Sequence, residues 1–216
     1  MIKAVFFDLD NTIYDYELCN DMAERALFEY LKNTFLIDIS KAGEYLAMAK
    51  EAVKSQLGDV ASSHNRLLYM QHICELLNVK PGRYAMDLYN TYWDAFLDNM
   101  IIFPDMKELI NKLRISGISI GLLTDLTAHI QYRKLIKLEI ADCFDYIITS
   151  EEAGHDKPDN SMFDLIVKKS GCAKEEVLVV GDDEKKDYYA AINHGFNSVR
   201  YTGQNSIKEI EEMIWK

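Results

Sequence analysis

Two aspartates one residue apart follow an apolar run near the N-terminus. The run AVFF leads into Asp8, with Asp10 two positions later and the polar pair Asn11 and Thr12 behind it. Side chains alternate along a strand, so we expect Asp8 and Asp10 to leave the backbone on the same side. Carboxylates at the end of a buried strand are costly unless a positive charge lies against them. The segment therefore predicts a bound cation, although the same residue types are also typical of a turn.

Two further apolar runs end in the same way, which favours the site over the turn. The run ISIGLLTD ends in Thr124 and Asp125, and the run VLVVGDD ends in Asp182 and Asp183. Helical patterns separate these runs, as in a parallel sheet that is covered on both faces. The carboxyl ends of parallel strands lie on one edge of the sheet, where ligands bind. We therefore expect these polar groups to converge there.

The acidic groups at this edge predict a divalent cation. Asp8, Asp10, Asp182 and Asp183 would be joined by Asp187, which lies just beyond at the start of a helix. Carboxylates held close together raise one another's pKa, and a hard cation with oxygen ligands relieves the repulsion. No cysteine or histidine is spaced to select a softer metal. Mg²⁺ is the expected ion.

A phosphate group at the same edge would need a cation besides the metal. Lys157 is the best candidate, because it follows the predicted strand DYIITS and precedes Pro158, which stiffens its loop. Thr124 offers a hydroxyl and a backbone N–H, and the next helix offers free N–H groups. The simpler alternatives are a surface position for Lys157 and helix capping by Thr124.

Composition limits the classes of function. The chain has 216 residues, of which 49% are hydrophobic, and its formal charge of −11 argues against a nucleic-acid partner. No apolar stretch approaches the ~20 residues that cross a bilayer, and no signal peptide is recognisable. Four widely spaced cysteines are typical of reduced thiols. We expect a cytoplasmic protein without a membrane partner; the oligomeric state does not follow from the sequence.

The periodicity of the chain changes twice and predicts two domains. Residues 1–14 and 100–216 are expected to form a doubly wound α/β domain with a parallel sheet, and residues 15–99 a helical insertion. Leu18 and Met48 are among the apolar residues that carry the helical spacing of the insertion, and Ile136 is one of those in the α/β domain. Helices are predicted at residues 63–77, 163–169 and 188–194, among others.

The motifs resemble a known family. DLDNT, Thr124, Lys157 and the run GDDEKKD resemble, in order and spacing, the four motifs of haloacid dehalogenase (HAD) superfamily hydrolases, which are mostly magnesium-dependent phosphatases. The resemblance covers nearly the whole chain and implies a Rossmann-like HAD core. Residues 15–99 look like a C1-type helical cap of that family.

The resemblance also implies catalytic roles. Asp8 would attack phosphorus and carry an aspartyl-phosphate, and Asp10 would protonate the leaving alcohol and then activate water. Thr124 and Lys157 would hold the phosphoryl oxygens. An aspartate two residues after the nucleophile is absent from family members that dehalogenate carbon substrates, so Asp10 favours phosphate esters.

The same resemblance implies the metal ligands. Asp8, the backbone carbonyl of Asp10, and Asp182 would bind Mg²⁺, with Asp183 or Asp187 binding directly or through water. Asp125 is a departure, because relatives with this kind of cap usually have asparagine there. Its additional negative charge raises a question about substrate choice.

We therefore expect a Mg²⁺-dependent phosphomonoesterase that acts on a small phosphorylated metabolite, for instance a nucleoside monophosphate or a sugar phosphate. A phosphomutase of the same family is the nearest alternative, and a catalytically silent regulatory binding protein is another. Tyr14, Tyr16 and Arg66 could contact the leaving group, although ordinary packing is the simpler explanation for each.

Overall fold

The structure is a computed structural model that describes residues 1–215. The chain forms two compact units, one made of Met1–Asp15 together with the chain from Ile101 onward, the other made of Tyr16–Met100. These borders lie one residue from the expected ones. Within residues 1–215, no helix combines the length and the apolar character that crossing a bilayer requires.

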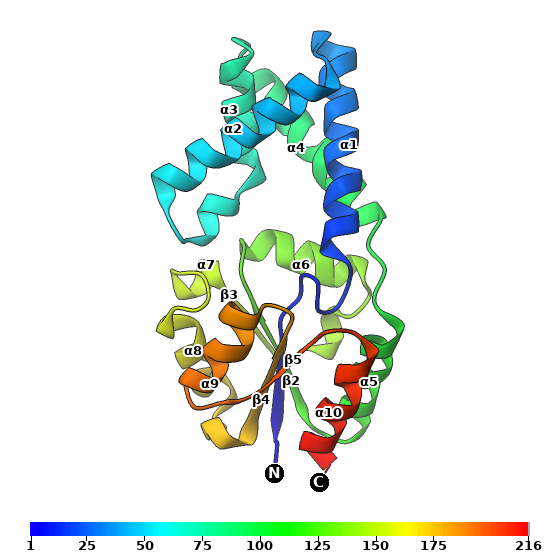
Figure 1. The fold of residues 1–216 in the computed structure, drawn as a ribbon, viewed down its shortest axis with the longest axis vertical. Coiled ribbons are helices and arrows are strands. Elements are labelled where there is room, and N and C mark those ends of the chain that lie inside the picture. Colours follow the sequence, from blue (N-terminus) through cyan, green and yellow to red (C-terminus); the bar gives the residue numbers. More distant parts are fainter. Residues whose placement is uncertain (216) are drawn as a thin grey trace. The chain divides into compact units, whose positions relative to one another are not determined.

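The first unit is built on a parallel sheet of five strands (Figure 1). They are β1 (Ala4–Phe7), β2 (Ser119–Thr124), β3 (Tyr146–Thr149), β4 (Val177–Gly181) and β5 (Asn197–Arg200). Their order is β3-β2-β1-β4-β5, so the N-terminal strand is central and fully buried. Phe7 pairs with Leu122 on one side and with Val180 on the other. This register sets the residue after β1 beside the ends of both neighbouring strands.

Helices cover both faces of this sheet. The unit contains α5 (Pro104–Ile115), α6 (Ala128–Lys137), α7 (Ser150–Ala153), α8 (Asn160–Ser170), α9 (Ala190–Asn193) and α10 (Gln204–Trp215). Helices α5 and α10 lie on one face, and α8 and α9 on the other (Figure 1). Phe6, Leu123, Phe163 and Val179 belong to the buried cluster on the α8–α9 face. The doubly wound α/β fold predicted from the sequence is confirmed.

Capping residues explain where the predicted helices begin and end. Helix α8 starts three residues before the predicted Phe163, because the Asp159 side chain accepts a hydrogen bond from the Ser161 N–H at 2.8 Å. It ends as predicted at Gly171, whose φ of 68° suits a residue without a Cβ. Helix α7 was not predicted; the Thr149 hydroxyl caps it by accepting from the Glu152 N–H.

The segment after β4 differs from the helix predicted at residues 188–194. A π-helical turn, η4 (Glu184–Tyr189), comes first, and the α-helical part is only α9. The Asp183 side chain caps η4 by accepting hydrogen bonds from the N–H groups of Lys185 and Lys186. A π-turn adds a residue to one helical turn and often occurs at functional sites.

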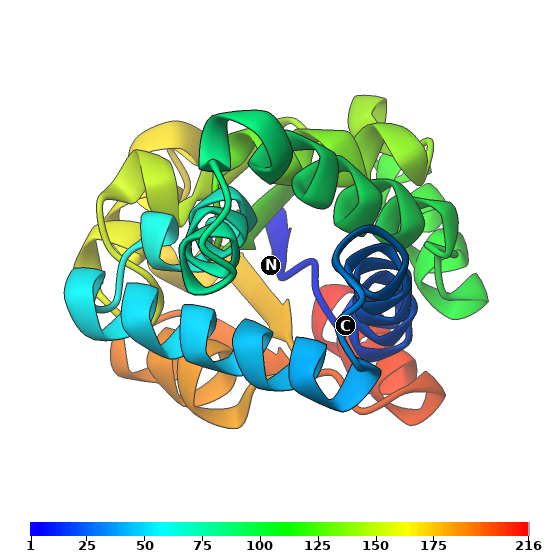
Figure 2. The ribbon, with the colours of Figure 1, turned by 90° about the horizontal axis from the view of Figure 1, so that it is seen from above.

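The second unit consists of helices. It contains α1 (Tyr16–Phe35), α2 (Ile39–Leu57), the short 3₁₀ helix η1 (Ala61–His64), α3 (Arg66–Leu76) and α4 (Pro81–Asp98). Helix α1 packs against α4, α4 against α3, and α3 against α2 (Figure 2). The helix predicted from Ser63 begins later, because the Asn65 side chain caps α3 at the N–H of Leu67.

Leu18 and Met48 lie on the solvent side of their helices, each with 52% of its surface exposed. The buried sides of α1 and α2 combine leucine and valine, such as Leu27 and Val53, with smaller residues such as Cys19 and Ala42. Small residues let helices approach closely.

Candidate active site

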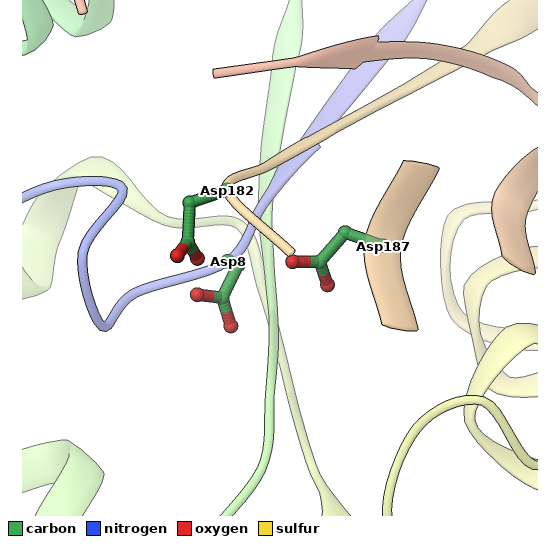
Figure 3. Close-up of side chains that lie close together, drawn as sticks. All are labelled: Asp8, Asp182 and Asp187. Atoms are coloured by element: carbon green, nitrogen blue, oxygen red, sulfur yellow. The ribbon is translucent and has the colours of Figure 1, made fainter. Parts of the chain in front are cut away.

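Three carboxylates meet at the carboxyl ends of β1 and β4. Asp8 directly follows β1, its N–H donates to the carbonyl of Val180 at 2.8 Å, and its side chain is almost fully buried. Asp182 directly follows β4, and Asp187 lies on η4. One oxygen from each of these three residues lies within 4.8 Å of the others, and Figure 3 shows the carboxyl groups gathered around the end of β1.

Gly181, the last residue of β4, makes room for one of these carboxylates. A Cβ atom at this position would overlap the carboxyl group of Asp187. The π-turn of η4 carries Asp187 over the strand end, where it is 1% exposed. Only glycine leaves space for this approach.

Lys157 reaches into the same group, so the surface alternative is wrong. Its Nζ lies 2.7 Å from Asp8 Oδ1, 2.6 Å from Asp187 Oδ1 and 3.1 Å from the carbonyl oxygen of Leu123. The residue is 4% exposed. Its backbone N–H donates to Asp125 Oδ1 at 2.9 Å, which fixes the loop that carries it.

The electrostatics of this cluster fit a divalent cation. Burial alone would lower the pKa of Lys157, but Asp187 and Asp8 raise it well above its usual value, so the ammonium keeps its charge. Burial raises the pKa of Asp8 well above the ordinary value although Lys157 opposes it, and burial followed by repulsion from Asp187 raises the pKa of Asp182 to about 6. The Lys157 ammonium pairs with Asp8 and Asp187, and Asp182 adds a third carboxylate to the same group. Hard oxygen donors at this spacing suit a hard divalent ion.

Thr124, at the end of β2, is held by a residue that the sequence did not reveal. Gln131 of α6 donates from Nε2 to Thr124 Oγ1 at 2.6 Å and to the carbonyl oxygen of Asp125 at 2.7 Å. In the opposite amide orientation, Oε1 of Gln131 would face the carbonyl oxygen of Asp125, and both atoms are acceptors. The contacts therefore assign Nε2 to this side of the amide. Because Gln131 donates, the Thr124 hydroxyl acts as a donor in turn, and its hydrogen bond to the carbonyl oxygen of Asp125 is long, at 3.3 Å.

The Asp10 carboxylate has hydrogen-bond partners of its own, and the common side expected for Asp8 and Asp10 stays a prediction. Strand β1 ends at Phe7, so Asp10 lies beyond the strand, directly before Asn11 with its φ of 60°. The Asp10 carboxylate lies 2.7 Å and 2.9 Å from Nζ of Lys134 and accepts a hydrogen bond from the hydroxyl of Tyr14.

Asp183 is also placed apart from the three clustered carboxylates. Its Oδ1 accepts from the N–H groups of Lys185 at 2.8 Å and Lys186 at 2.9 Å. Burial alone would raise its pKa, but these hydrogen bonds lower it. Of the two acidic residues left open by the sequence, the geometry favours Asp187 as the direct ligand and gives Asp183 a capping role.

The sequence held one signal for the unpredicted residues. Gln131 and Lys134 are three apart on α6 and both are fully buried. Two polar side chains on the buried side of an amphipathic helix call for partners, because burying them alone is costly. The apolar pattern of this helix did not indicate its buried side correctly. It included Ile136, which is 66% exposed.

Two other candidates, Tyr16 and Arg66, bind each other within the helical unit. Arg66 donates from Nη2 to the Tyr16 hydroxyl at 2.6 Å and from Nη1 to the carbonyl of His64 at 2.8 Å. Their contact with a leaving group stays a prediction.

Comparison with known proteins shows the family to which the chain belongs. The model of the haloacid dehalogenase-like hydrolase family matches residues 2–195. This chain belongs to the haloacid dehalogenase-like hydrolases. It is 36% identical to the ribulose-1,5-bisphosphate 5-phosphatase of Halopiger xanaduensis over 204 residues, which cover 93% of this chain and 85% of the relative. It is 30% identical to the glyceraldehyde 3-phosphate phosphatase of Methanocaldococcus jannaschii over 217 residues, which cover 98% of this chain and 90% of the relative.

A solved structure shares the fold of this haloacid dehalogenase-like hydrolase. The HAD phosphatase from Thermococcus onnurineus has a TM-score of 0.76 at 21% identity, with 99% of this chain and 98% of that chain covered. The predicted family and the α/β fold with a helical insertion are confirmed, as is the expected phosphomonoesterase class of enzyme. The C1 type of the insertion stays a prediction.

Proposed function

We propose that this protein is a magnesium-dependent phosphatase that hydrolyses a small phosphorylated metabolite through an aspartyl-phosphate on Asp8. The observation that carries the proposal is the position of Lys157, which binds Asp8 and Asp187 together at the end of the central strand. A structural ion pair needs one acid and one base. Here one ammonium pairs with two carboxylates of a group of three, and the acidity of this group suits a second cation.

Asp8 has the surroundings of a carboxylate nucleophile. Lys157 donates to its Oδ1, so Oδ2 keeps its lone pairs for attack on phosphorus. Attack forms an oxygen–phosphorus bond to Asp8 as the bond to the leaving oxygen breaks, and water then hydrolyses the acyl phosphate. Such a covalent intermediate splits a difficult displacement into two easier steps.

Asp10 would exchange the protons of both steps. It would donate a proton to the leaving oxygen and then accept one from the attacking water, an assistance worth typically ~10²–10⁴-fold. With 24% of its side chain exposed, Asp10 is open enough to meet a substrate. Thr124, whose hydroxyl makes only a long hydrogen bond of 3.3 Å to the Asp125 carbonyl, and Lys157 would hold the phosphoryl oxygens.

Asp8, Asp182 and Asp187 would hold Mg²⁺ through carboxylate oxygens, with the backbone carbonyl of Asp10 as a further ligand. When bound, the ion adds positive charge next to the phosphoryl oxygens, where much of phosphoryl-transfer catalysis acts. In this arrangement Asp183 would support the site as the cap of η4.

The relatives suggest the class of substrate. Both curated relatives described above are named for phosphates of small sugars, a ketopentose bisphosphate and a triose phosphate. A sugar phosphate is therefore the favoured substrate class for this chain, ahead of a nucleoside monophosphate. A cytoplasmic location would suit such a metabolite.

The test is release of inorganic phosphate by the purified full-length protein. Substrates are p-nitrophenyl phosphate and a panel that includes ribulose 1,5-bisphosphate, glyceraldehyde 3-phosphate and nucleoside monophosphates, each with Mg²⁺ and with EDTA. We expect release that depends on Mg²⁺ and is abolished in Asp8→Asn. Asp164→Asn is the matched control, because Asp164 is an exposed aspartate on α8.

Three outcomes would contradict the proposal. Equal inertness of wild type and Asp8→Asn across the panel would favour the silent binding protein. Single-turnover transfer of the phosphoryl group to a second sugar hydroxyl, rather than to water, would favour the phosphomutase. Absence of a phosphoryl group on acid-quenched wild-type protein, measured by mass spectrometry during turnover, would exclude the covalent step.

A further inference from the structure

A fully buried lysine lies against the predicted acid–base residue. Lys134 on α6 has none of its side chain exposed, and its Nζ lies 2.7 Å and 2.9 Å from the two carboxylate oxygens of Asp10. Removing an ammonium from water costs several kcal/mol, and exchanging a buried ion pair for apolar side chains is often neutral or stabilising. Packing alone therefore gives no reason for lysine at this position.

The hydrogen bonds distinguish the two oxygens of Asp10. Oδ1 accepts from both the Tyr14 hydroxyl and Lys134, whereas Oδ2 accepts from Lys134. Each carboxylate oxygen has two lone pairs, so Oδ1 is saturated. Among the residues that the structure describes, Oδ2 keeps one lone pair free. The Tyr14 ring also lies 5.7 Å from Lys134 Nζ, so the three side chains form one packed group.

We infer that Lys134 is the positioning residue for the acid–base step: it holds the Asp10 carboxyl group so that Oδ2 exchanges the proton with the leaving oxygen and with water. The inference rests on the proposed phosphatase function. Lys134 itself touches Asp10, not the reacting atoms, and acts through the orientation of that side chain. Fixing a catalytic group in one orientation lowers the barrier of the step that it assists.

Helix α6 connects this role to phosphate binding. Gln131, one turn before Lys134, holds the Thr124 hydroxyl, so one buried side of one helix orients two of the predicted site residues. Because α6 directly follows β2, it is set against the strand end that carries Thr124. The same helix therefore aligns the phosphate-binding and proton-transferring groups.

The experiment measures how activity depends on the leaving group in Lys134→Met. Kinetics are compared for p-nitrophenyl phosphate, whose leaving group is a weak base, and for phenyl phosphate, whose leaving group needs a proton more. We expect kcat for phenyl phosphate to fall on the order of 10²-fold and kcat for p-nitrophenyl phosphate only a few-fold, with KM unchanged. Lys208→Met, at an exposed lysine of α10, is the matched control and should leave kcat unchanged for both substrates.

A double-mutant cycle separates this role from a structural one. In an Asp10→Asn background, Lys134→Met should have little further effect, because its target is gone. A fall in kcat that is equal for both substrates would overturn the inference. So would a fall in kcat that Lys134→Met still causes in the Asp10→Asn background. If Lys134→Met does not fold, Lys134→Gln carries the same comparison, since its shorter neutral side chain cannot serve both oxygens.

The same data separate the inference from the function on which it rests. A wild-type protein that releases no phosphate from either aryl phosphate or from the metabolite panel contradicts the proposed function. An active wild type with an unchanged leaving-group profile in Lys134→Met contradicts only the role of Lys134.

Discussion

The Nζ atom of Lys186 lies 2.9 Å from Oδ2 of Asp125, the residue that directly follows Thr124. The other carboxylate oxygen of Asp125 accepts the backbone N–H of Lys157. Burial alone would lower the pKa of Lys186, but Asp125 raises it, so the pair is charged. The negative charge of Asp125 is therefore balanced within the site, while the contact to the Lys157 loop needs only an oxygen acceptor.

The first prediction follows from this pair. Lys186→Met should raise KM for a phosphate ester and weaken inhibition by inorganic phosphate, because Asp125 then repels the anion. The Lys186 side chain is 42% exposed to solvent, so the effect should be a few-fold, as for ion pairs near the surface (about 1 kcal/mol). Steady-state kinetics at low ionic strength measure it.

Asp125→Asn provides the control for this prediction. The amide keeps an oxygen for the Lys157 N–H and removes the charge, so Asp125→Asn combined with Lys186→Met should restore phosphate affinity. If the double variant is as weak as Lys186→Met alone, Lys186 contributes something other than neutralisation of Asp125.

The second prediction concerns the lysine shared by two buried carboxylates. Lys157→Met should lower kcat with any phosphate ester by on the order of 10²–10³-fold, because a positive charge beside the reacting group is lost. It should also destabilise the metal-free protein by about 3 kcal/mol, since Asp8 and Asp187 lose their buried partner.

Urea denaturation in EDTA and in excess Mg²⁺ checks this second effect. Added metal should recover part of the lost free energy of unfolding, because it supplies charge to the same carboxylates. Lys168→Met, at an exposed lysine of α8, should change neither kcat nor the free energy of unfolding. An unchanged unfolding free energy for Lys157→Met would mean that the buried ion pairs do not form in solution.

The third prediction is a pH-dependent response to magnesium. Burial, followed by repulsion from Asp187, raises the pKa of Asp182 from 3.8 to about 6. Without metal, the folded protein then binds more protons than the unfolded chain between those pH values, so this group's contribution to stability falls as pH rises through that window. Mg²⁺ needs the carboxylate, so it should raise Tm little near pH 5 and clearly above pH 7.

Differential scanning fluorimetry with and without Mg²⁺ across this pH range measures the response. In Asp182→Asn the magnesium-induced shift should be small at every pH, whereas Asp164→Asn should behave as wild type. A magnesium shift of equal size at pH 5 and pH 7 would show that Asp182 does not titrate as a ligand.

The strand ends could be predicted from the sequence because each is a local feature. A buried run that stops at Asp8, Thr124 or Asp182 places its polar group at the sheet edge wherever the helices lie. The length of β1 was harder to predict from the sequence. The strand itself ends at Phe7, and the partners of Asp10, which lies three residues beyond it, did not follow from alternation.

The partners of the site residues could not be predicted, because they depend on distances between segments far apart in the chain. The contact of Lys134 with Asp10 spans 124 positions, and that of Lys157 with Asp8 spans 149. A buried polar side chain on a helix indicates that it has a partner without naming it. The π-turn of η4 likewise brings Asp187 close to Gly181, a contact that no local helix signal encodes.

The last prediction tests how the phosphate-binding hydroxyl is oriented. Gln131→Leu removes the donor at Thr124 Oγ1 and at the carbonyl of Asp125, so the long 3.3 Å hydrogen bond from the threonine hydroxyl to that carbonyl can tighten. The hydroxyl would then be partly lost to the phosphoryl group. KM and the inhibition constant for phosphate should rise roughly 10-fold, the cost of about one hydrogen bond. Gln131→Glu should be worse, because a carboxylate oxygen would face that carbonyl.

Thr124→Val decides whether Gln131 acts through Thr124. With the hydroxyl absent, Gln131→Leu should add little, so the two changes should be strongly non-additive in phosphate affinity. Fully additive effects would mean that Gln131 supports the Asp125 carbonyl or the packing of α6 instead. Thermal melts of Gln131→Leu, Thr124→Val and the double variant control for packing. A general loosening of α6 would lower Tm in proportion to the loss of phosphate affinity.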